Sequence, residues 1–200
     1  MSGCDCGTAQ AEQFERKTLI TLLLINAVMF VTELAFGLLA QSTGLIADSL
    51  DMLADAAVYG IALYAVGRGL LLQTKAAEVS GYLQIILGTG VLLEVVRRVM
   101  FGSEPESMLI VSVGAAALVA NLVCLGLISK HRNGGIHMRA SWIFSTNDVI
   151  ANLGVIVSGV LVAVLGSRIP DLIVGAVISA IVVRGGMQIL KETRQARTCQ

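Results

Sequence analysis

Long apolar stretches separated by short polar segments constrain this chain more than any other feature of its sequence. They comprise residues 18–40, 45–66, 79–99, 108–129, 142–165 and 172–190. Each is close to the length of about 20 residues that an α-helix needs to cross the hydrocarbon core of a bilayer. With 56% hydrophobic and only 14% charged residues, the chain lies outside the range of soluble proteins. We therefore expect an all-α, polytopic membrane protein with six transmembrane helices.

The polar segments predict how the chain is organised across the membrane. Residues 1–17 are expected to form a cytoplasmic tail, 18–190 a six-helix transmembrane domain, and 191–200 a second short cytoplasmic tail. Most lysine and arginine residues fall in the segments that share a side with the N-terminus, which indicates that both termini are cytoplasmic. The basic residues expected on the opposite side are Arg97, Arg98 and Arg168. We expect the membrane to be the bacterial inner membrane.

Three aspartates in the second apolar run carry the strongest functional signal. Asp48, Asp51 and Asp55 follow one another at intervals of three and four residues, so a helix places them on one face. Each carboxylate inside a membrane costs roughly 2.5–3.5 kcal/mol on insertion scales, and the three repel one another when ionised. They are tolerable with bound protons, a cation or a water-filled cavity. A helix end among the lipid headgroups is the alternative, and it suits Asp48 better than Asp55.

The fifth apolar run supplies matching polar residues. Asp148 and Asn152 share a helical face, and Ser145 lies one turn before them. Together with Asp51 and Asp55, Asp148 and Asn152 predict an oxygen-rich site for a divalent metal. The secondary candidates for this site are Asp48, Ser145 and Asn147. A hydrogen bond between helices is an equally good role for Asn152.

Two further features of the sequence allow more than one interpretation. Glu33 lies inside the first apolar run. We expect it either to belong to the ion pathway, for example as a proton relay, or to form a hydrogen bond to a neighbouring helix. Cys4 and Cys6, near the N-terminus, are poorly spaced for a disulfide with each other. Their thiolates are suited to capturing a soft metal, or they are thiols of a tail with no function.

The order of these motifs resembles that of the cation diffusion facilitator family. The resemblance covers residues 18–190. In the first two runs it rests on Asn26, Glu33, Gly37, Ser42, Ala47, Asp48, Asp51 and Asp55. In the last two it rests on the run from Asp148 to Ile156 and on Pro170 and Asp171. The resemblance implies a homodimeric, proton-coupled exporter of divalent transition metals that works by alternating access.

The same resemblance implies a metal site and shows two departures from the family pattern. Carried over, the family's ligands fall at Asp51, Asp55, position 144 and Asp148, and Phe144 cannot bind a metal. The family's cytoplasmic C-terminal domain has no counterpart in this sequence, so we expect a short member of the family. Such a chain alternatively serves as a membrane-embedded metal sensor or accessory protein that holds an ion without transporting it.

The remaining expectations concern partners. The transported ion belongs to the class of Zn, Cd, Co, Fe or Mn, and no prosthetic group is expected. The partners are then the lipid bilayer, divalent metal ions, protons and a second copy of the chain. Nucleic acid is not expected because the chain has no basic patch with interleaved aromatic residues. Because no sequence motif pairs a nucleophile with a base, we do not expect an enzyme.

Overall fold

Six helices make up the computed structural model, which describes the backbone of residues 5–65, 70–129 and 136–198. Side chains are described at residues 16–61, 63, 64, 75, 77–129 and 148–195. The helices are α1 (Asp5–Leu39), α2 (Thr43–Ala65), α3 (Leu70–Phe101), α4 (Ser107–Ser129), α5 (Ile136–Leu165) and α6 (Ile169–Thr198). The described part contains no strand, which confirms the expected all-α class.

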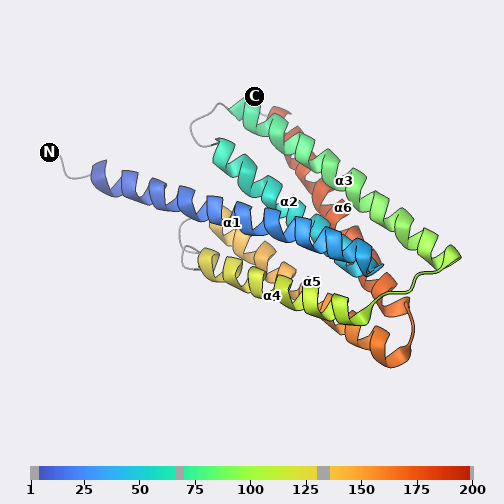
Figure 1. Cartoon of the computed structure of the whole chain (residues 1–200). Coiled ribbons are helices and arrows are strands. Elements are labelled where there is room, and N and C mark those ends of the chain that lie inside the picture. Colours follow the sequence, from blue (N-terminus) through green and yellow to red (C-terminus); the bar gives the residue numbers. More distant parts are fainter. Residues whose placement is uncertain (1–4, 66–69, 130–135, 199–200) are drawn as a thin grey trace.

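Each predicted apolar run corresponds to one of these helices. Three helices extend well beyond their runs: α1 begins at Asp5, within the segment expected to be a tail, α3 begins at Leu70, and α6 continues to Thr198. In Figure 1 the first turns of α1 project beyond the rest of the bundle. The first residues of α1 and the last residues of α6 lie at the same end of the bundle (Figure 1).

Five of the six helices are long and apolar enough to cross a membrane, among the residues described. The exception is α2, whose three aspartates make it too acidic for a helix that faces lipid. This helix is also the central one, because it packs against each of the other five. In Figure 1 the pair α3 and α6 lies on one side of α2, and the pair α4 and α5 lies on the other. The other helices therefore cover the acidic first half of α2, whereas Val58 and Tyr64 in its second half are exposed.

Glycines allow the outer helices to pack closely in pairs. A Cβ atom at Gly159 of α5 would lie 2.8 Å from Ile110 Cγ2 of α4. A Cβ atom at Gly186 of α6 would lie 2.8 Å from the backbone oxygen of Gly81 in α3. Small residues are the usual means of close helix approach in membranes, where burial from water does not drive association. In the α3–α6 pair the two backbones therefore lie against each other, and in the α4–α5 pair the side chains of α4 lie against the backbone of α5.

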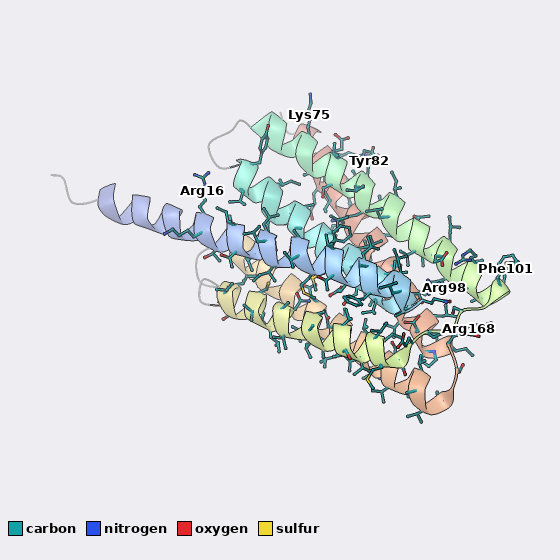
Figure 2. The ribbon with its side chains drawn as sticks, viewed as in Figure 1. Arg16, Lys75, Tyr82, Arg98, Phe101 and Arg168 are labelled. Carbon is teal, nitrogen blue, oxygen red and sulfur yellow. The ribbon has the colours of Figure 1, made fainter. Side chains whose placement is uncertain are left out.

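The end of the bundle opposite the termini is closed by interactions between helix ends. Arg98 and Arg168 lie at this end, whereas Arg16 and Lys75 lie at the end that holds the termini (Figure 2). Arg98 is only 5% exposed and donates hydrogen bonds to the backbone oxygen of Gln41 and to the Glu94 carboxylate. We call this the outer end of the bundle, because the distribution of basic residues predicts that it faces away from the cytoplasm.

Replacing Gly186 by alanine should destabilise the α3–α6 pair. The new methyl group would meet the Gly81 backbone oxygen, which cannot move without separating the helices. Overpacking of this kind costs about 1–3 kcal/mol. Thermal unfolding in detergent should therefore show a lower midpoint for Gly186→Ala. Gly126→Ala is the control, because a Cβ there has no neighbour within 4 Å. Equal midpoints for the two variants would contradict this packing.

Candidate metal site

The acidic face of α2 meets different neighbours at different depths. Residues 42–50 are all buried, and Asp48 is 1% exposed. Asp51 and Asp55, further from the outer end, are partly exposed. The aspartates consequently belong to two groups: Asp48 lies against α1, and Asp51 and Asp55 lie against α5.

Asp148 of α5 joins the two deeper aspartates of α2. Its carboxyl group lies within hydrogen-bonding range of the carboxyl groups of Asp51 and Asp55. Like them, it is partly exposed. An ionised carboxylate only accepts hydrogen bonds, so groups this close together need protons, a cation or water between them. The structure thus brings together three of the four ligands predicted from the sequence.

Asn152, the fourth predicted ligand, lies one turn further along α5 and is fully buried. Its Nδ2 atom donates to the backbone oxygen of Asp148 at 2.9 Å, a bond within the same helix. Its Oδ1 atom accepts no hydrogen bond. Buried amide oxygens normally have a donor, so this oxygen remains available to a proton donor or a metal ion.

The carboxylates lie close together but do not form a complete metal-coordination site. Among the described side chains, no three of the His, Cys, Asp and Glu type enclose a position for a metal ion. Ser145 and Asn147 lie on α5, as does Phe144, but their side chains are outside the described residues. An ion bound between Asp51, Asp55 and Asp148 would therefore need these carboxylates to converge, or further ligands from the first part of α5.

The other predicted candidates fall into two groups. Cys4 lies outside the described residues, and Cys6 lies in α1 with a side chain that is not described. Glu33, by contrast, is 0% exposed, and its carboxyl group lies within hydrogen-bonding range of Asp48. Neither Glu33 oxygen nor Asp48 Oδ2 receives a hydrogen bond from a protein donor. These two acids bond to each other only when one of them carries a proton.

A further polar contact joins α1 to α4 next to the site, and its two residues were not predicted as site residues. Asn26 of α1 donates through Nδ2 to the Leu22 backbone oxygen at 2.9 Å and to Cys124 Sγ of α4 at 3.8 Å. Asp55 and Asp148 are near enough to act electrostatically on the Cys124 thiol. The signal available in the sequence was the spacing of Asn121 and Cys124, which places two polar residues on one face of α4.

Replacing Glu33 by glutamine should preserve or raise the stability of the protein. The amide can donate a hydrogen bond to Asp48 without a bound proton, so the contact no longer depends on protonation. Glu33→Ala should instead lower stability, because it opens a cavity and leaves Asp48 without a partner, at a cost of about 1–3 kcal/mol. Thermal unfolding in detergent at neutral pH distinguishes the two. A midpoint for Glu33→Gln as low as that of Glu33→Ala would show that the acids do not face each other.

Comparison with known proteins identifies the family. Residues 19–69 and 72–196 match the family described as the cation efflux transmembrane domain. The chain is 26% identical over 199 residues to the zinc transporter ZitB of Yersinia pestis, covering 93% of this chain and 64% of that protein. It is 29% identical over 203 residues to the zinc transporter ZitB of Pectobacterium atrosepticum, covering 92% of this chain and 62% of that protein. Over 133 residues it is 32% identical to the vacuolar zinc transporter ZRC1 of Saccharomyces cerevisiae, covering 60% of this chain and 30% of that protein.

The chain spans less than two thirds of the length of these relatives. The matched residues include parts of all six helices and every carboxylate of the site. The family is one of transport domains, which agrees with the expectation that the chain is not an enzyme. The chain therefore belongs to the cation efflux family, as the resemblance to cation diffusion facilitators predicted, and it contains the transmembrane domain of that family.

Proposed function

We propose that this protein exports a divalent transition metal, foremost zinc, from the cytoplasm in exchange for protons. The contact of Asp148 on α5 with Asp51 and Asp55 on α2 carries this proposal. Three carboxylates held together in the centre of a membrane domain are stabilised by a positively charged partner. Because the chain belongs to the cation efflux family, a metal ion is the partner that we propose.

The choice of zinc rests on the relatives. The ZitB proteins of two bacteria and the yeast ZRC1 protein are each named zinc transporters. Aspartate oxygens are suitable zinc ligands, at distances of about 2.0–2.2 Å. The same donors also accept Cd, Co, Fe or Mn, and these ions compete with zinc in our proposal. The oxygen-rich ligand set alone favours harder ions such as Mn or Fe.

Proton exchange follows from the chemistry of the ligands. A carboxylate must lose its proton before it binds a metal, so metal entry displaces protons from the site. Protons that return from the other side of the membrane compete with the metal for Asp51, Asp55 and Asp148 and release it. Glu33 and Asp48, which need at least one proton between them, lie on the outer side of this site and suit a proton relay.

The burial pattern supports access to the site from the end that holds the termini. Residues 42–50 are buried on the outer side of the site, and Leu45, Ile46 and Leu50 pack into the main hydrophobic core. The three carboxylates themselves are partly exposed. The distribution of basic residues predicts that the termini are cytoplasmic, so the ion would enter from the cytoplasm. A homodimer in a bacterial inner membrane remains part of this proposal on the family resemblance.

Replacing either Asp51 or Asp148 by alanine should abolish most of the transport. Each change removes one of three facing carboxylates, and we expect zinc flux to fall at least about tenfold. The measurement is zinc flux into proteoliposomes, followed with a zinc-sensitive dye, with a pH-sensitive dye to record proton counterflow. Ser112→Ala is the control, because this exposed hydroxyl bonds only to the Met108 backbone oxygen of its own helix.

Two outcomes would contradict the proposal in different ways. Normal flux in both aspartate variants would show that these carboxylates do not bind the transported ion. Zinc binding without zinc flux in the unsubstituted protein would instead favour the alternative function, a membrane-embedded sensor or accessory protein.

A further inference from the structure

Asp171, in the first turn of α6, is a buried carboxylate that binds the beginning of α2. It is 1% exposed. Its Oδ1 atom accepts hydrogen bonds from Ser42 Oγ at 2.5 Å and from the Gly44 backbone N–H at 3.1 Å. Its Oδ2 atom accepts from the Thr43 backbone N–H at 2.7 Å and from Thr43 Oγ1 at 2.8 Å. We call this group of residues 42–44 and Asp171 the α2 clamp.

The clamp satisfies the backbone donors that the start of a helix leaves unpaired. The N–H groups of Thr43 and Gly44 bond to Asp171, and that of Leu45 bonds to Ser42 Oγ at 3.1 Å. The first turn of α2 contains no acidic residue of its own, so Asp171 supplies the negative charge that a helix N-terminus favours. Asp171 also lies in the first turn of α6. One carboxylate thus interacts with the positive ends of two helices.

Close backbone packing holds α2 at the same level. A Cβ atom at Gly175 of α6 would lie 2.7 Å from the Thr43 backbone carbon. A Cβ atom at Gly37 of α1 would lie 3.0 Å from the Ile46 backbone nitrogen. The start of α2 is therefore packed closely against the backbones of both α1 and α6.

The clamp lies at some distance from the metal site. At 1.5 Å per residue, Asp51 and Asp55 are about 12 and 18 Å along α2 from Thr43. A tilt of about 3° at the clamp would displace Asp55 by about 1 Å, whereas metal–ligand distances tolerate only about 0.2 Å. Rotation of α2 about its axis would turn both carboxylates away from Asp148.

We propose that Asp171 is a positioning residue of the metal site: it fixes the tilt and rotation of α2 and thereby sets Asp51 and Asp55 against Asp148. This inference rests on the proposed metal-binding function of these three carboxylates. Asp171 itself is not a ligand, because both of its oxygens are already engaged by donors of α2 and the preceding Ser42. Its effect on the metal passes through the geometry of one helix.

Asp171→Asn and Gly175→Ala test the inference in two independent ways, one by changing hydrogen bonds and the other by changing steric packing. The first replaces one acceptor with an NH2 group that faces donors, and the second places a methyl group against the Thr43 backbone. The purified full chain is titrated with Co2+, whose visible absorption reports the geometry of its ligands. We expect both variants to weaken Co2+ binding about tenfold and to change the absorption spectrum, because the aspartates no longer converge.

Control variants separate positioning from general stability. Gly90→Ala should leave Co2+ binding unchanged, since a Cβ there has no neighbour within 4 Å. Gly186→Ala should lower the unfolding midpoint and leave the Co2+ spectrum unchanged, because it disturbs α3 and α6 away from the clamp. Thr43→Ser should bind Co2+ as the unsubstituted chain does, since it keeps the hydroxyl group. Thr43→Val removes that hydroxyl group and should weaken Co2+ binding less than Asp171→Asn does. This milder variant tests the inference if Asp171→Asn and Gly175→Ala do not fold.

The outcomes distinguish this inference from the proposed function. Co2+ binding that is lost in Asp51→Ala but unchanged in Asp171→Asn, Gly175→Ala and Thr43→Val would overturn the inference alone. Variants of the clamp that lower the unfolding midpoint as Gly186→Ala does, with no change in the Co2+ spectrum, would also overturn it. Absence of Co2+ binding in the unsubstituted chain would overturn the metal site and this inference with it.

Discussion

The structure depends on the high cost of placing carboxylates in a hydrocarbon environment. Asp48, Asp51 and Asp55 cannot face lipid, so the helix that carries them must be surrounded by other helices. This accounts for the central position of α2, which contacts all five remaining helices. It also accounts for the apolar character of those five, which are the ones suited to face the bilayer. The acidic residues of one helix thus account for its contacts with all the others.

Much of this arrangement could be predicted from the sequence because it follows from local patterns. The number and type of the helices follow from the lengths of the apolar runs, and the common face of Asp51 and Asp55 follows from helical spacing. Asp148 could be expected to join them because its run carries a matching polar face and the family resemblance implies a ligand at that position. The family assignment agrees with these expectations. The cost of placing an acidic residue in a membrane can be estimated for each residue from the sequence alone. The functional residues that incur this cost can therefore be predicted before the packing of the helices is known.

Features that depend on how helices pack could not be predicted in the same way. The spacing of Asp48 gave it the same face as Asp51, yet its neighbour is Glu33 of α1, since that face meets α1 and α5 at different depths. The bonds of Asp171 to Ser42 and Thr43 join residues far apart in the sequence, and an acid in a short connection between helices would ordinarily be assigned to water. Each of these residues could be found in the sequence, but the contacts of Asp48 with Glu33 and of Asp171 with Ser42 and Thr43 could not be predicted from it.

The dry packing of residues 42–50 has an electrical consequence. These residues span about 13 Å of helix, much less than the hydrocarbon core of about 30 Å. If solvent reaches the carboxylates from the side of the termini, most of the membrane voltage falls across this thin insulating layer. Moving a divalent ion alone across the full membrane voltage changes its electrical free energy by about 4.6 kcal/mol per 100 mV. Two protons crossing in the opposite direction cancel that change, so an exchange of one ion for two protons is insensitive to voltage.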